Sequence, residues 1–72
     1  MTEERATAEA VWFAKRAFAG YVIEPIETTP HGNDFLVTIS IAKKEQRPKK
    51  TTATLTVSPK GTYWTYEPTL PS

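Results

Sequence analysis

Cysteine is absent from this 72-residue chain, and histidine occurs once, as His31. The missing thiols exclude a disulfide framework and a thiolate-ligated zinc or iron–sulfur site. The three glycines, Gly20, Gly32 and Gly61, are too scattered to form a phosphate-binding loop. A serine or threonine nucleophile would depend on His31 as its base, and His31 stands between Pro30 and a glycine in a polar segment. The sequence therefore predicts neither a cofactor nor a metal site.

The carboxylates do not suggest acid–base chemistry either. Glu3 and Glu4 open a helical pattern, whereas Glu24 and Glu27 flank a proline in an extended pattern. Paired carboxylates perform acid–base catalysis when they converge in different environments, and these pairs are expected to face water. We therefore expect a protein without enzymatic activity.

Long apolar runs are also missing. Residues 1–10 are mixed and acidic, which predicts neither a secretory signal nor a membrane span. The expected location is cytoplasmic. The length predicts one domain, residues 1–72, which buries roughly 60% of its unfolded surface. Such a core seldom supplies more than about 3–5 kcal/mol of net folding stability. Association into a homo-oligomer is therefore one way in which the chain could gain stability.

The formal net charge is only +1, but the charges are unevenly distributed along the chain. Residues 1–34 carry six acidic and three basic side chains, whereas residues 43–60 carry six basic and one acidic. The distribution predicts a weak electrostatic dipole.

The first segment is a helix by composition and by its end signals. Thr2 is a good N-cap, and Ala19 precedes Gly20, a natural left-handed cap. Alanine at six positions between these ends favours the helical state. We predict a helix from Glu3 to Ala19, whose sheet-facing side carries Ala6, Ala10, Val11, Phe13, Ala14, Ala17 and Phe18.

Trp12 falls on the opposite side of that helix, among Arg5, Glu9, Arg16 and Ala19. Arg16 follows it by four residues, a spacing that allows the guanidinium to stack on the indole. The pair is either a surface contact of structural value alone or an anchor for a partner, since tryptophan and arginine are enriched at binding hot spots.

The stretch Phe35–Ala42 is the predicted central strand. Phe35, Val37, Ile39 and Ile41 alternate with smaller or polar residues, so one face of the strand is apolar. The preceding segment, residues 21–27, is predicted either to be an edge strand or to carry a bulge at Glu24-Pro25. Residues 28–34 are predicted to form a loop.

Residues 43–51 are predicted to form an exposed basic hairpin loop, because they contain no apolar side chain. The following run, residues 52–57, alternates threonine with Ala53, Leu55 and Val57, as a half-buried strand does. Pro68 and Pro71 indicate a frayed tail over residues 68–72.

The turn at Ser58-Pro59-Lys60-Gly61 decides which face Trp64 occupies. A three-residue loop with a left-handed glycine would place Val57 opposite Tyr63 and turn Trp64 and Tyr66 to the exterior. A register shifted by one residue would bury both aromatic side chains instead. The glycine-bulge register is the one that we predict.

These elements predict an α+β fold, with one N-terminal helix packed on a four-stranded antiparallel β-meander. In topology alone this order resembles the cystatin-like helix-plus-meander domains. The chain carries none of their sequence motifs, so the resemblance implies no functional residue.

Two binding surfaces follow from this prediction. The first binds a protein partner, or a second copy, through Trp12 and Arg16 on the helix or through Trp64 and Tyr66 on a sheet face with Leu36, Thr38, Thr54 and Thr56. The alternative binds nucleic acid, with Trp64 and Tyr66 as a stacking platform. Its cations would be Lys43, Lys44, Arg47, Lys49, Lys50 and Lys60.

Overall fold

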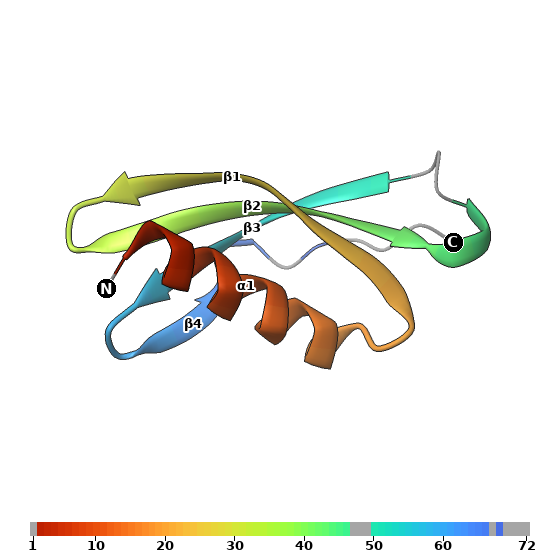
Figure 1. Ribbon diagram of the computed structural model, residues 1–72, viewed down its shortest axis with the longest axis horizontal. Helices are drawn as coiled ribbons and strands as arrows, with labels where there is room; N and C mark the ends of the chain where they lie inside the picture. The colour runs from red at the N-terminus through yellow and green to blue at the C-terminus, as the bar shows by residue number, and fades with distance from the viewer. Residues whose placement is uncertain (1, 47–49, 67, 69–72) are drawn as a thin grey trace.

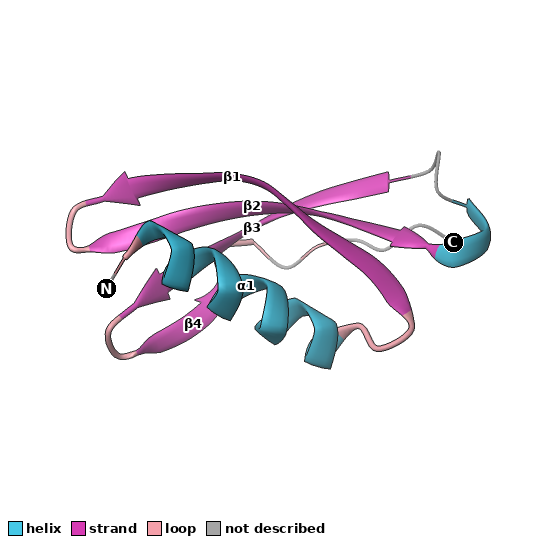
Figure 2. Ribbon diagram, in the orientation of Figure 1, coloured by secondary structure: helices cyan, strands magenta, loops and turns pink. Residues whose placement is uncertain are grey.

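The structure is a computed structural model that describes residues 2–46, 50–66 and 68. It contains one long helix and one antiparallel sheet, in which neighbouring strands follow the chain order (Figure 1 and Figure 2). The elements are α1 (Glu3–Ala17), β1 (Tyr21–His31), β2 (Asp34–Lys43), the 3₁₀ turn η1 (Lys44–Gln46), β3 (Lys50–Ser58) and β4 (Gly61–Trp64). The predicted α+β fold, a helix on a four-stranded meander, is confirmed.

Helix α1 begins as predicted, because the Thr2 hydroxyl accepts a hydrogen bond from the Arg5 N–H at 3.2 Å. It ends at Ala17, two residues before the predicted end. Phe18 leaves the helical conformation while its N–H still donates to the Ala14 carbonyl at 2.8 Å. The early end lets the Phe18 ring turn inward, 6.2 Å from the ring of Tyr21. Gly20 has the expected positive φ, 90°.

The core lies between α1 and the sheet. Ala6, Ala10 and Ala14 are fully buried and form a stripe of small side chains that lets the helix backbone approach the strands. The sheet contributes the alternating apolar face predicted for the central strand, together with that of β3. Its fully buried side chains are Val37, Ile39, Ile41, Leu55 and Val57. Ala17, which we predicted on the packed side, is exposed because the helix ends there.

Strand β1 is longer than predicted. The predicted loop over residues 28–34 reduces to a two-residue turn at Gly32-Asn33, with His31 paired to Asp34. Thr28 pairs with Val37, and its hydroxyl shares a hydrogen bond with that of Thr7 on α1, which holds this part of β1 against the helix. Threonine's β-branched side chain suits such a strand.

Strand β1 shows both of the predicted alternatives, the edge position and the irregularity. Among the described strands it pairs only with β2, and the register shifts between Pro25 and Glu27 rather than at Glu24-Pro25. Ile26 is left unpaired and is 57% exposed.

The register predicted for the β3–β4 hairpin is wrong. Ser58 pairs with Gly61 and Leu55 with Trp64, so the loop contains only Pro59 and Lys60. The Ser58 hydroxyl stabilises this tighter turn by donating to the Gly61 carbonyl at 3.0 Å and accepting from the Lys60 N–H at 3.2 Å. Gly61 has φ 150°, a conformation that glycine adopts readily and other residues avoid.

The sheet face away from α1 is rich in threonine. Leu36 pairs with Thr56 and Thr38 with Thr54, and these residues alternate with the buried core positions. Thr56 also shares a hydrogen bond of 2.8 Å with Thr65, which extends the β4 side of the sheet by one residue. Within the described part of the chain, no helix is both long and apolar enough to cross a membrane.

Candidate protein-binding surface

Trp12 lies on the outer side of α1, as predicted. Its residue surface is 61% exposed, because the alanine stripe turns the opposite side of the helix to the sheet. The Arg16 guanidinium carbon lies 4.7 Å from the centroid of the indole ring. Such a cation–π contact contributes about 0.5–1 kcal/mol at an exposed site. The contact leaves much of the indole surface in water.

An ion pair continues this side of the helix. The Arg5 Nε lies 3.3 Å from the Glu9 Oε1, one turn of helix before the tryptophan. Both side chains are exposed, so the pair contributes little to stability. Arg5, Glu9, Trp12 and Arg16 therefore form one outward stripe, which we call the helix stripe.

Trp12 separates two hollows in the surface. One hollow lies toward β4 and is lined by Glu9, Trp12, Phe13 and Thr62. The other lies toward β1, and its lining includes Trp12, Val11, Ile23 and Pro25. A partner could therefore contact the indole from both sides while inserting its own apolar side chains beside it.

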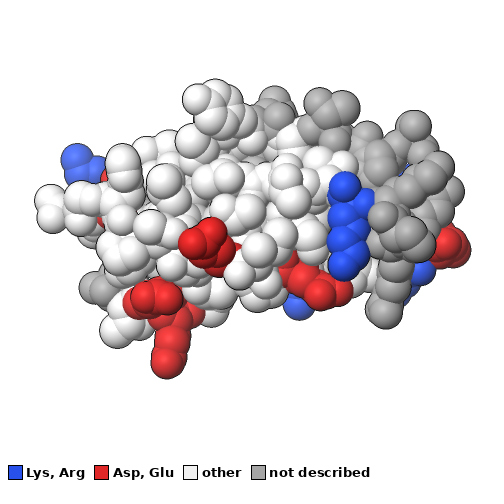
Figure 3. All heavy atoms as spheres, turned by 90° about the horizontal axis from the view of Figure 1, so that it is seen from above, with Lys and Arg blue, Asp and Glu red and all other residues white. Residues whose placement is uncertain are grey.

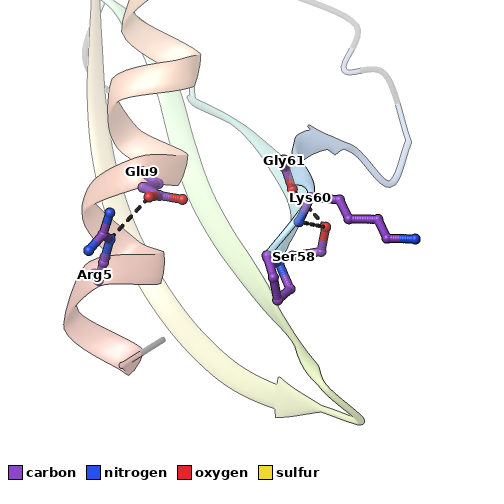
Figure 4. A pocket seen from close by; sticks show the side chains of 6 residues that line it. Arg5, Glu9, Ser58, Lys60 and Gly61 are labelled. Atoms are coloured by element: carbon purple, nitrogen blue, oxygen red, sulfur yellow. Dashed lines mark hydrogen bonds and ion pairs between the residues drawn. The ribbon is translucent and has the colours of Figure 1, made fainter.

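A further pocket of about 420 Å³ lies at the N-terminal end of the helix stripe. Figure 4 shows the Arg5–Glu9 pair on one side of it and the β3–β4 turn on the other. The Lys60 side chain extends away from the helix (Figure 4). The two walls thus offer polar groups from α1 and backbone from the turn.

Trp64 does not belong to an exposed surface, contrary to our prediction. With the observed register it is half-buried on the helix side of the sheet. Its ring centroid lies 5.5 Å from that of Phe13, with the ring planes at 70°, and 5.5 Å from that of Phe18. Trp64 therefore acts in packing.

The exposed aromatic residues on the β4 side are Tyr63 and Tyr66. Tyr66, a predicted contact residue, is 81% exposed and follows the end of β4. Tyr63 is 55% exposed and pairs with Thr56 on the threonine-rich face. Sequence reasoning missed Tyr63 because the predicted register placed it in the core.

The predicted nucleic-acid residues are divided between the two ends of the sheet. Lys43 ends β2, Lys44 opens η1 and Lys50 begins β3, while Arg47 and Lys49 lie outside the described residues. Lys60 follows the opposite end of β3, roughly 26 Å away at the usual rise per strand residue. The inward-facing Trp64 is also unavailable as a stacking platform at this surface.

Charges of both signs lie on the side of the molecule that Figure 3 shows, and acidic side chains are spread between the basic ones there. The described residues also contain no group of three or more His, Cys, Asp or Glu side chains that could hold a metal ion.

No protein-family model, curated protein or solved structure matches this chain.

Proposed function

We propose that this chain is a small non-catalytic interaction module that binds a protein partner through the helix stripe, with Trp12 as the central contact. The observation that carries the proposal is the exposed indole of Trp12 with Arg16 stacked on it. Tryptophan and arginine are the residue types most enriched among binding hot spots. Covering the indole would also remove a large apolar surface from water.

The arrangement reduces the entropic cost of binding. Ordering a free side chain at an interface costs about 0.5–1.5 kcal/mol, and Arg16 already restricts the Trp12 ring. The Arg5–Glu9 pair supplies a polar border next to the apolar centre, as in many interfaces. The hollows beside the indole offer positions for apolar side chains of the partner.

The titratable side chains named as candidates for catalysis are all exposed in the described part of the chain, which supports a role in binding. His31 is exposed at the end of β1, and Glu3, Glu4, Glu24 and Glu27 are exposed on α1 and β1. Nucleic-acid binding through Lys43, Lys44 and Lys50 receives less support, because Lys60 lies at the other end of the sheet.

The proposal can be tested with a photo-crosslinking amino acid placed at Ala8, an exposed helix residue that lines the hollow beside Trp12. The same group at Thr52, exposed on β3, provides the matched control. A protein crosslinked at position 8 and not at position 52 would then be purified and titrated against the wild type and Trp12→Ala. We expect Trp12→Ala to weaken binding at least tenfold, about 1.4 kcal/mol or more. Equal affinity of the two proteins would overturn the proposal.

A further inference from the structure

Strand β4 has an outer edge with unpaired backbone groups. Among the described strands, β4 pairs only with β3. The Thr65 N–H donates to the Thr54 carbonyl at 3.0 Å, which makes this facing pair hydrogen-bonded. Hydrogen-bonded and non-hydrogen-bonded pairs alternate along an antiparallel ladder. The neighbouring Leu55–Trp64 pair is therefore a non-hydrogen-bonded pair. The N–H and C=O groups of Trp64, and by the same alternation those of Thr62, therefore point away from β3.

The other edge of the sheet is poorly suited to pairing. β1 contains Pro25 and Pro30, which have no N–H to donate. The register shift at Ile26 interrupts the strand between them, and Glu24 and Glu27 add exposed charges beside it. Prolines, bulges and charges are the features by which sheet edges avoid pairing with other chains.

β4 has none of these features. Its four residues, Gly61–Trp64, include no proline and no charged side chain. Because the described sheet has one edge suited to pairing, two copies that join edge to edge do so through β4 of each. Such a two-fold contact closes on itself, whereas a contact between two different edges would continue into a filament.

From this geometry we infer that β4 pairs in antiparallel orientation with β4 of a second copy of the chain. The register that uses every outward group of β4 places Thr62 of one copy opposite Trp64 of the other, and the reverse. Tyr63 then lies opposite Tyr63 of the second copy in a non-hydrogen-bonded pair, where side chains are closest. The pairing covers the exposed Tyr63 rings on the face away from α1 and makes one continuous sheet of the two subunits.

A second copy fits this edge better than an acidic peptide does. Two of the cations on α1 already have partners, since Arg5 pairs with Glu9 and Arg16 lies on Trp12. The strand itself carries no charge that an acidic partner would neutralise. An uncharged, symmetric edge matches its own copy without placing like charges opposite each other.

The expected dimer is weak. Four strand residues on each copy supply less than the roughly 800 Å² per partner of a standard interface, so we expect a dissociation constant in the micromolar to millimolar range. The helix stripe is a separate surface, so this inference goes beyond the proposed function. Failure of the dimer would leave the crosslinking test of Trp12 unaffected.

Amide hydrogen exchange measured by NMR tests the pairing at the atoms concerned. In dilute protein the Thr62 and Trp64 amides have no partner in the ladder and are expected to exchange rapidly. Between about 10 μM and about 1 mM protein, we expect both rates to fall, by about twofold if the dissociation constant is about 1 mM and several-fold if it is about 0.1 mM or lower. The Tyr63 and Thr65 amides face β3 and serve as internal controls. Rates at Thr62 and Trp64 that do not change with concentration would overturn the inference, as would protection that develops on β1 or α1 instead.

A charge exchange at Tyr63 supplies an independent test. Tyr63→Lys and Tyr63→Glu each place like charges opposite in the homodimer, and each should weaken it about fivefold or more in sedimentation equilibrium. An equimolar mixture of the two variants should recover association, because opposite charges then face each other. Thr52→Lys adds a charge on β3 and should leave association unchanged. If the mixture associates no better than the single variants, the pairing is not through β4.

Binding of an acidic extended peptide that protects Thr62 and Trp64 in monomeric protein would identify a different occupant and likewise overturn the inference.

Discussion

The rings of Phe13 and Trp64 meet edge to face, with their centroids 5.5 Å apart and their planes at 70°. The contact joins the middle of α1 to the last residue of β4, two elements at opposite ends of the chain. It follows from the two-residue turn between β3 and β4, which places Trp64 opposite Leu55 on the core side of the sheet. The two tryptophans of the chain consequently have different roles, Trp64 in packing and Trp12 at the surface.

Removing the Trp64 ring should largely unfold the domain. Trp64→Ala deletes contacts with both Phe13 and Phe18, and we expect a loss of about 2–4 kcal/mol in the free energy of unfolding. A domain of this size commonly has a total stability of about 3–5 kcal/mol. Urea denaturation followed by circular dichroism would measure the change. Trp64→Phe, which keeps an aromatic ring, should lose much less, and equal losses for the two variants would contradict the packing role.

Removing the Trp12 ring should have little effect on folding. Trp12→Ala abolishes the stacking with Arg16, so the expected loss is about 1 kcal/mol or less. The same urea titration measures it, and Arg16→Ala is the matched variant because it removes the other half of the contact. If Trp12→Ala lost as much unfolding free energy as Trp64→Ala, the Trp12 indole would have a structural role.

The turn between β1 and β2 requires glycine for its backbone conformation alone. Gly32 has φ 63°, and a Cβ built there has no neighbouring atom within 4 Å. We therefore expect Gly32→Ala to cost about 1 kcal/mol in unfolding free energy, while Gly32→Asn costs less because asparagine tolerates left-handed conformations. Equal stability of wild type and Gly32→Ala would show that the turn changes its geometry.

Binding of nucleic acid should be absent or weak. Five phosphate contacts on duplex DNA would give a slope of roughly −4.5 in log K against log salt concentration. We expect fluorescence anisotropy with a generic oligonucleotide to show a shallower slope, because Trp64 faces the helix and Lys60 lies at the other end of β3, so neither adds to the cations of residues 43–51. A slope near −4.5 would instead favour the predicted basic loop over residues 43–51 as the functional surface.

The sequence predicts the helix and the central strand well, because both are specified by several signals that agree. Thr2 as N-cap, the alanines and the apolar alternation from Val37 to Ile41 each favour the observed structure. The prediction of the helix and of the central strand does not depend on the geometry of any one turn. Trp12 and Arg16 were predicted together for the same reason, since helical spacing alone brings them into contact.

The register of the β3–β4 hairpin is less well determined by the sequence than the helix and the central strand are. One residue more or less in the loop exchanges the two faces of β4, and Ser58-Pro59-Lys60-Gly61 is compatible with both lengths. Burial of Trp64 against Phe13 and Phe18 favours the shorter loop, and that packing involves residues some fifty positions apart in the chain. The exposure of Tyr63 was missed as a direct consequence.

The central claim is that α1 presents Trp12 to the solvent while β4 turns Trp64 toward the helix. Acrylamide quenching of the single-tryptophan variants Trp64→Phe and Trp12→Phe tests it most directly, since each retains one indole. We expect the Trp12 emission to be quenched several-fold more strongly than the Trp64 emission, with a spectrum at longer wavelength. Two equally shielded indoles, or stronger quenching of Trp64, would contradict the claim.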